Sequence, residues 1–273
     1  MNQAPVGAFA TVGPGWRIHH HILGEGPPVL FLHGSGPGAS GWSNFAANGE
    51  AFAAAGFQAI LADSLGYGLS DKPTDVDYTL ERMSGAMLEL MDQLGHPRFS
   101  IVGNSQGGAM ALRLALDHPD RVERLVLMAP GGLEPREVFL AMKGIRSMMR
   151  CLYGPEGLTE AGMRILFEKQ LYDSSLVTDA LVAERTAAAK AQPLHVFRSM
   201  VVGNLEAELS ALRCPVLGLW GVDDQFCPVS GASKLAERVP GARVVLFQGC
   251  GHWVMVEKAD VFNRLALDFL RHG

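Results

Sequence analysis

The chain has 273 residues, 48% of them hydrophobic, which is enough for one large α/β domain or for a domain with an insertion. Lys and Arg number 23 against 28 acidic residues, giving a formal net charge of −5 without a run of like charge. This balance disfavours nucleic acid and anionic membranes as partners. The longest mostly apolar run, residues 51–62, is too short to span a bilayer, and the N-terminal residues lack a signal-peptide pattern.

Short apolar runs alternate with helical patterns along the chain. Arg17–Pro28 predicts a strand that pairs antiparallel and then enters a turn. The following continuous apolar runs predict strands of a mostly parallel sheet that is buried on both faces. The predicted strands are Val29–His33, Gln58–Ala62, Phe99–Gly103, Leu125–Ala129, Val216–Trp220 and Arg243–Phe247. The predicted helices are Leu80–Leu94, Gly107–Asp117, Gly231–Val239 and Ala259–Leu270. The predicted fold class is therefore α/β, with helices flanking the sheet.

The strand pattern stops between Gly132 and Leu209 and is replaced by helical patterns. We predict a helical cap of residues 132–209 inserted after the sixth strand, above a core of residues 1–131 and 210–273. Methionine side chains are flexible and can line an adaptable apolar pocket. Five of the twelve methionines lie in this insertion: Met142, Met148, Met149, Met163 and Met200.

Histidines and cysteines give no metal-binding pattern. His19, His20 and His21 would alternate between the two faces of a strand and so cannot converge on one metal. The cysteines show neither C-x-x-C pairing nor zinc spacing and are typical of reduced thiols in a cytoplasmic protein. They are Cys151, Cys214, Cys227 and Cys250. We predict neither a metal nor a cofactor.

The stretch FLHGSGPGASGW, residues 31–42, admits two interpretations. Gly36, Gly38 and Gly41 fit the G-x-G-x-x-G spacing of dinucleotide-binding loops, and Asp63 follows the next strand, where a ribose-binding acid would lie. Alternatively, a glycine-rich loop after a strand can supply backbone N–H groups to an oxyanion. The choice depends on which partners the rest of the chain provides.

Ser105 is a candidate nucleophile. The sequence Gly103-Asn-Ser-Gln-Gly107 links a predicted buried strand directly to a predicted helix, which is the context that G-x-S-x-G requires. The glycines leave room for a strained turn that exposes the hydroxyl beside a helix N-terminus. The backbone N–H of Gln106 would then form part of an oxyanion hole, with Ser35 or Gly36 as the second donor.

A serine hydroxyl needs a base and an acid that orients this base. His252 lies in a glycine-rich loop after the last predicted strand, and Asp223 and Asp224 follow the strand before it. The order Ser, Asp, His along the chain is the order expected for this arrangement. Spacing favours Asp224 as the acid and leaves Asp223 as the alternative. Because dinucleotide binding explains none of these residues, we favour the oxyanion interpretation of the glycine stretch.

With these motifs together, the sequence resembles the α/β-hydrolase fold and, more narrowly, the meta-cleavage product hydrolases, which split C–C bonds in 2-hydroxy-6-oxo-dienoates. The resemblance covers nearly the whole chain. It is strongest in HGSGPGASGWSNF, GNSQGG, LVTDALVAERTAA and CGHWVMVEKADVFNRLALDFLRH. It implies a homo-oligomer, a triad of Ser105, His252 and Asp224, and a group that holds the dienoate carboxylate and 2-oxo oxygen. That group is Asn44, Asn104, Arg185 and Trp253, with Gly36 beside them.

The resemblance also implies a mechanism, and the sequence departs from the family pattern in two places. His252 would move the proton that converts the dienol to its keto tautomer, and Ser105 would then attack the distal carbonyl or assist water in doing so. Gln106 stands where the family commonly has methionine, and the C-terminal part of the insertion is shorter. The alternative functions are a carboxylesterase or lactonase with the same triad and a non-catalytic receptor on this fold.

Overall fold

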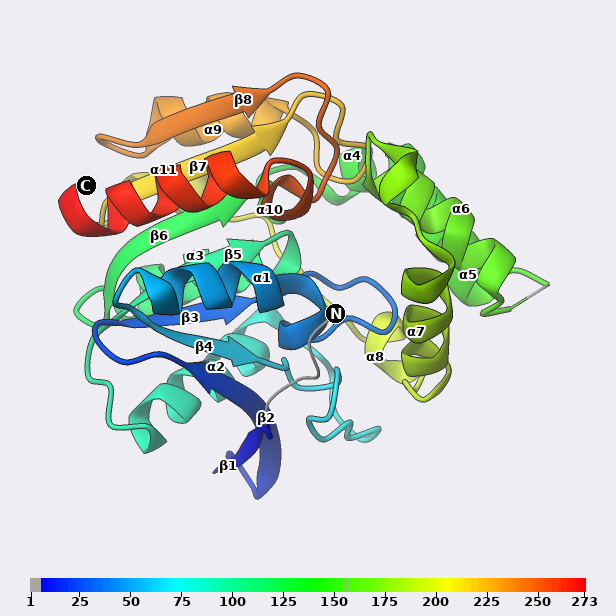
Figure 1. Cartoon of the computed structure of the whole chain (residues 1–273), viewed down its shortest axis with the longest axis horizontal. Helices are drawn as coiled ribbons and strands as arrows, with labels where there is room; N and C mark the ends of the chain where they lie inside the picture. The colour runs from blue at the N-terminus through cyan, green and yellow to red at the C-terminus, as the bar shows by residue number, and fades with distance from the viewer. Residues whose placement is uncertain (1–5, 156) are drawn as a thin grey trace.

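The computed structural model describes residues 6–155 and 157–273. Residues 1–5, which belong to the predicted core and to the stretch inspected for a signal peptide, lie outside the described residues, as does residue 156 of the predicted cap. Within the described residues, eight strands form one sheet in the order β1-β2-β4-β3-β5-β6-β7-β8 (Figure 1). They are β1 (Ala8–Val12), β2 (Trp16–Leu23), β3 (Pro28–Leu32), β4 (Gln58–Ala62), β5 (Phe99–Asn104), β6 (Val122–Met128), β7 (Val216–Gly221) and β8 (Arg243–Phe247).

The pairing of the strands confirms the predicted α/β class. The strands from β4 through β3, β5, β6 and β7 to β8 are parallel, whereas β2 pairs antiparallel with both β1 and β4. The predicted antiparallel start is therefore correct. In a parallel sheet the carboxyl ends of all strands meet at one edge, so the loops after β3, β5, β7 and β8 lie near each other.

Helices cover both faces of this sheet (Figure 1). They are α1 (Gly41–Ala54), α2 (Leu80–Gln93), α3 (Gln106–Asp117), α4 (Arg136–Ala141), α5 (Lys143–Tyr153), α6 (Glu160–Gln170), α7 (Asp179–Lys190), α8 (His195–Arg198), α9 (Ser230–Arg238), α10 (Val254–Glu257) and α11 (Ala259–His272). Short 3-10 turns span Ser174–Leu176 and Glu206–Ala211. None of the helices in the described parts of the chain has the length and apolar character needed to cross a bilayer.

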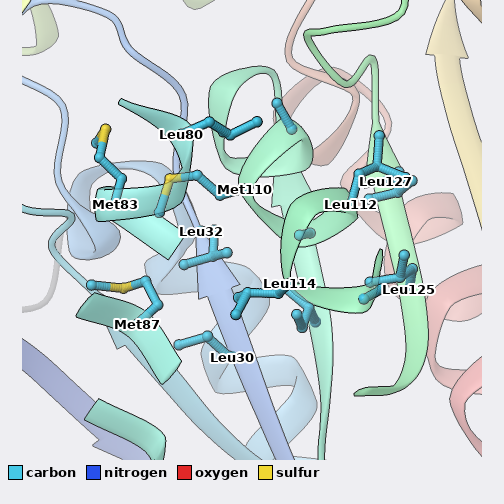
Figure 2. Packing of buried hydrophobic residues seen from close by; sticks show 14 of the residues in the cluster. Leu30, Leu32, Leu80, Met83, Met87, Met110, Leu112, Leu114, Leu125 and Leu127 are labelled. Carbon is cyan, nitrogen blue, oxygen red and sulfur yellow. The ribbon is translucent and has the colours of Figure 1, made fainter. Parts of the chain in front are cut away.

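Alternation along β3 shows how the sheet divides the core. Leu30 and Leu32 pack with α2 and α3 on one face, where Figure 2 shows Leu32 near Met110 and Leu30 near Met87 and Leu114. Val29 and Phe31 lie on the opposite face of the sheet, which α1 and α11 cover. Because successive side chains of a strand point to opposite faces, an uninterrupted apolar run is what a doubly covered strand requires.

The segment between β6 and β7 carries α4 to α8. In Figure 1 these helices gather in green and yellow-green beyond the carboxyl ends of the strands. The chain leaves and returns at one point, where the Leu205 N–H donates to the Gly132 carbonyl at 2.6 Å. The division into a core and a cap of residues 132–209 stays a prediction.

Three details differ from the sequence prediction. β8 is the edge strand and its residues are exposed or half-buried, so burial on both faces was wrong for this strand. β1 and α1 were not predicted at all. The sequence does not predict α1 because the buried face of this helix includes Asn44, Asn48 and two glycines, which weakens the apolar periodicity.

Candidate active site

Ser105 lies in a sharp turn between β5 and α3. Its φ of 55° and ψ of −118° are strained for a residue with a side chain. A Cβ added at Gly103 would lie 2.7 Å from the Gly107 carbonyl oxygen, and one at Gly107 would lie 2.1 Å from the Leu32 carbonyl oxygen. The two glycines of G-x-S-x-G are thus required by close backbone contacts. They allow the serine to lie at the carboxyl end of β5, next to the N-terminus of α3.

His252 and Asp224 form a buried pair at the same edge. Their side chains are almost fully buried, and His252 Nδ1 lies 2.7 Å from Asp224 Oδ2. The other carboxylate oxygen accepts hydrogen bonds from the N–H groups of Phe226 and Cys227. Because the carboxylate holds Nδ1 as a donor, Nε2 of a neutral imidazole is left as the basic nitrogen.

Asp223 does not contact His252. Its carboxylate is exposed and accepts a hydrogen bond from the Gly249 N–H at 3.0 Å. Of the two acids that the sequence left open, the structure therefore brings Asp224 to the histidine.

The thiol of Cys227 also belongs to this centre. Burial raises its pKa well above the ordinary value, the charge of Asp224 raises it further, and a contact with the Ser105 hydroxyl opposes both effects. The thiol is therefore neutral at physiological pH and acts as an uncharged neighbour of the serine.

The glycine stretch after β3 passes over Ser105. A Cβ at Gly34 would lie 3.1 Å from the Ser105 Cβ, and Gly34, Ser35 and Gly36 line one cavity together with Ser105 and His252. Gln106 is the first residue of α3, so its backbone N–H faces the same turn. The Gln106 side chain instead donates to Met83 Sδ and does not line this cavity.

His33 fixes the shape of that loop. The Ser64 N–H donates to His33 Nε2 at 3.1 Å, so the other ring nitrogen, Nδ1, carries the proton and donates to the Gly34 carbonyl at 2.8 Å. Burial lowers the pKa of His33. The neutral ring therefore serves as a rigid brace at the beginning of the loop.

Asp63 has a structural role that excludes ribose binding. Its carboxylate accepts hydrogen bonds from His19 Nδ1 and from the N–H groups of Gly41 and Leu69. Burial alone would raise the pKa of Asp63, but these hydrogen bonds, that of His19 first, leave it below its ordinary value. Gly38, with φ of 68°, packs against the backbone of Arg185. Both features that suggested a dinucleotide site are thus used inside the fold.

Arg185 is a buried cation in the wall of the same cavity. It comes from α7 and is 1% exposed, and its guanidinium donates to Ser43 Oγ at 2.6 Å and to Asn44 Oδ1 at 2.9 Å. Its Nε has no hydrogen-bond partner, and within the described residues no carboxylate pairs with it. Burial lowers its pKa to about 10, so the side chain is still a cation at pH 7.

Two aromatic rings flank this cation. The Arg185 guanidinium carbon lies 5.5 Å from the Trp253 ring and 5.7 Å from the Phe167 ring. Such contacts stabilise a cation without neutralising it. The indole N–H of Trp253 finds no hydrogen-bond acceptor among the residues described, although the ring lines the cavity. Arg185 and Trp253 both line the cavity, so the cavity wall carries a net positive charge.

Asn104 joins the serine turn to the histidine loop. Its amide nitrogen donates to the carbonyls of Met128 and His252, at 3.2 and 3.4 Å. Its Oδ1 is buried and has no hydrogen-bond partner in the described part of the chain. Asn104 lines the cavity, and its amide oxygen is left as a free acceptor, whereas its role toward a substrate stays a prediction.

The remaining wall of the cavity was not identified from the sequence. Gln170 from α6 lines it, and so do apolar side chains from α5, α6 and the loop after β7, namely Ile145, Met148, Leu166 and Phe226. Of the five insertion methionines, Met148 alone lines this cavity, whereas Met163 is buried in the core and Met149 is exposed. The apolar residues of α6 recur at three- and four-residue spacing, which predicts a buried helix face. This pattern does not distinguish a face that packs in the core from one that lines a pocket.

Known proteins resemble this chain over nearly its whole length. A protein-family model described as the alpha/beta hydrolase fold matches residues 27–259. A 2-hydroxy-6-oxononadienedioate/2-hydroxy-6-oxononatrienedioate hydrolase of Comamonas testosteroni is 37% identical over 287 aligned positions, covering 100% of this chain and 99% of the relative. A 2-hydroxy-6-oxo-6-phenylhexa-2,4-dienoate hydrolase of Burkholderia cepacia is 36% identical, with the same two coverages.

Solved structures agree. A meta-cleavage product hydrolase from Pseudomonas fluorescens IP01 superposes with a TM-score of 0.84 at 30% identity, covering 94% of this chain and 95% of the other. The fold and the matched family model define an enzyme class, the α/β hydrolases. Within that class, the chain belongs to the meta-cleavage product hydrolases.

Proposed function

We propose that this protein hydrolyses a C–C bond in 2-hydroxy-6-oxo-hexa-2,4-dienoate-type products of aromatic ring fission. The observation that carries the proposal is the buried, unneutralised cation of Arg185 in the cavity that also contains Ser105 and His252. A buried charge without a counter-ion is costly, and a substrate carboxylate would relieve this cost. A plain esterase acting on neutral esters has no use for such a group.

The substrate would bind with its carboxylate at Arg185. Asn44 and Trp253, whose indole N–H is unused, would donate further hydrogen bonds to the carboxylate or the 2-oxygen, and Gly36 lies beside the guanidinium. The unpartnered Oδ1 of Asn104 suits the 2-hydroxyl of the dienol form, because a hydroxyl can donate to it. This orientation would direct the 6-oxo carbon toward Ser105.

His252 and Ser105 would then carry the chemistry. His252 moves the proton from the 2-hydroxyl to C5, which gives the keto tautomer and makes C5 a better leaving carbon. Ser105 Oγ attacks C6 after His252 takes its proton, and the oxyanion forms against the N–H groups of Gln106 and the Ser35/Gly36 loop. The C5–C6 bond breaks and its electron pair forms a dienolate, whose 2-oxygen takes up the proton held by His252 to give the 2-hydroxydienoate. Water then hydrolyses the acyl group on Ser105 and releases the carboxylic acid.

Asp224 would hold His252 in the required tautomer throughout, as its 2.7 Å contact with Nδ1 suggests. We further propose that residues 132–209 act as a cap, because Met148, Leu166 and Arg185 from this segment complete the cavity wall. A homo-oligomer, dimer or larger, and a cytoplasmic location are proposed from the sequence resemblance and the reduced thiols alone.

The test is turnover of a synthetic 6-substituted 2-hydroxy-6-oxo-dienoate, followed by the loss of its visible absorbance and by chromatography of the two products. We expect one equivalent each of the carboxylic acid and the 2-hydroxydienoate. Ser105→Ala is the matched control and should bind the dienoate without releasing products. Rapid hydrolysis of short aryl esters combined with no cleavage of any dienoate would refute the proposal and would favour an esterase.

A further inference from the structure

Glu257, at the end of α10, returns to the loop that precedes His252. One of its carboxylate oxygens accepts a hydrogen bond from the Gly251 N–H at 2.7 Å and contacts the Cys250 thiol. The other oxygen accepts from the N–H groups of Tyr172 and Asp173, at 2.6 and 2.9 Å. One half-buried carboxylate thus joins the histidine loop to the segment that follows α6.

The two segments joined by Glu257 also contact each other directly. The His252 N–H donates to the Gln170 carbonyl at 2.8 Å. A Cβ added at Gly251 would lie 2.6 Å from that same oxygen and 2.9 Å from the Tyr172 nitrogen. Residues 170–172 therefore pack directly against the backbone of Gly251 and His252.

Glu257 itself does not line the cavity that contains Ser105. Glu257 reaches the site through Gly251 and the backbone of His252 on one side and through residues 171–173 on the other. Hydrogen bonds from neutral N–H groups to a carboxylate are stronger than those to a neutral acceptor. Three such N–H groups converge on Glu257, so it determines the separation between the histidine loop and residues 171–173.

We propose that Glu257 is a positioning residue for the hydrolysis, fixing the backbone that holds the His252 ring between Asp224 and Ser105. The inference rests on the proposed role of His252. A base that must move a proton at two points of the reaction tolerates little displacement, because misplacement by about 1 Å can cost on the order of 100-fold in rate.

The test compares Glu257→Gln with Asp223→Asn as a matched control. The substitution Glu257→Gln keeps the size of the side chain but replaces one acceptor oxygen with an NH₂ group, which would oppose the Gly251 or the Tyr172 N–H. Asp223 accepts a hydrogen bond from Gly249 in the same loop but does not reach residues 171–173. Each variant is assayed for kcat and KM on a dienoate and on a short aryl ester, together with its thermal unfolding.

For E257Q we expect kcat to fall by about 10- to 100-fold on both substrates, because both need His252. KM for the dienoate should stay within about threefold of the wild-type value, because the hydrogen bonds of Arg185 are untouched. D223N should stay within about twofold in both constants. Glu257→Asp, which keeps the charge on a shorter side chain, provides a second variant and should show a smaller loss with the same division between kcat and KM.

Three results would overturn the proposal: kcat of E257Q within twofold of wild type, a rise in KM with kcat retained, or a loss explained by the unfolded fraction at the assay temperature. The ester assay separates this proposal from the proposed function. If wild-type protein cleaves no dienoate but hydrolyses the ester, the C–C function fails and Glu257 is still tested through His252.

Discussion

Replacing Arg185 with methionine should lower kcat/KM for the dienoate by about 10²- to 10⁴-fold without destabilising the protein. The side chain is 1% exposed and burial lowers its pKa from 12.5 to about 10. At about 1.36 kcal/mol for each pKa unit, keeping this charge inside the folded protein costs on the order of 3 kcal/mol at pH 7. Methionine has a similar apolar length and removes that cost, while Ser43 and Asn44 each lose one hydrogen bond worth about 1 kcal/mol. We therefore expect the free energy of unfolding of R185M to be unchanged or higher.

The catalytic loss is expected to be large. Hydrogen bonds from a cation to a carboxylate contribute about 1.5–3 kcal/mol each, so a two-point contact implies a loss of about 10²- to 10⁴-fold in kcat/KM for the dienoate. A neutral aryl ester makes no such contact, and its kcat/KM should stay within about threefold of the wild-type value.

The assay measures both substrates and the urea-induced unfolding of the variant. Arg150→Met, at an exposed arginine of α5, is the matched control and should leave both activities unchanged. Equal losses on the dienoate and the ester would refute the carboxylate role. A marked loss of stability in R185M would refute the reasoning about the buried charge.

Three further predictions follow from the geometry. Asp224→Asn should lower kcat by about 10³- to 10⁴-fold while Asp223→Asn stays within about twofold, and similar losses in steady-state assays of both variants would contradict the assignment. Because burial lowers the pKa of His33 below its unfolded value of 6.5, the unfolded state takes up a proton first as the pH falls, so the free energy of unfolding should decrease below about pH 6.5. His33→Gln should weaken this pH dependence in chemical denaturation, and an unchanged slope would contradict it. Gly107→Ala should lower the free energy of unfolding by about 1–3 kcal/mol or more, because its Cβ would lie 2.1 Å from the Leu32 carbonyl oxygen. Gly85 in α2 has open space around it, so Gly85→Ala should raise the free energy of unfolding by about 0.5–1 kcal/mol in the same thermal scans.

Some features of the molecule could be predicted because they depend on local patterns. A doubly covered strand must be apolar at every position, which is why β3, β4, β5 and β7 were found to within one residue, whereas β6 begins at Val122, three residues before the predicted start. The turn at Ser105 could be found because its backbone leaves no room for a Cβ at Gly103 or Gly107. In both cases the constraint acts on residues that are adjacent in the sequence.

Other features depend on contacts between distant segments. The polar buried face of α1 exists because Asn44 accepts a hydrogen bond from Arg185, 141 positions away, and Asn48 donates to the Met255 carbonyl. Asn104 donates to the carbonyls of Met128 and His252, which lie 24 and 148 positions away in the sequence. The polar character of a residue is visible in the sequence, whereas its partner is not.

The contact between Gly251 and residues 170–172 bears on how this enzyme family can be engineered. A segment exchange between relatives would replace the helices above the sheet, and with them the carbonyl of Gln170 that receives the His252 N–H. Graft boundaries placed at 132 and 209 would leave Glu257 and Gly251 from one parent facing a 170–173 backbone from another. Chimeras that transfer these two surfaces together should keep their turnover, and substrate range can then be altered through side chains such as Met148 without disturbing this backbone contact.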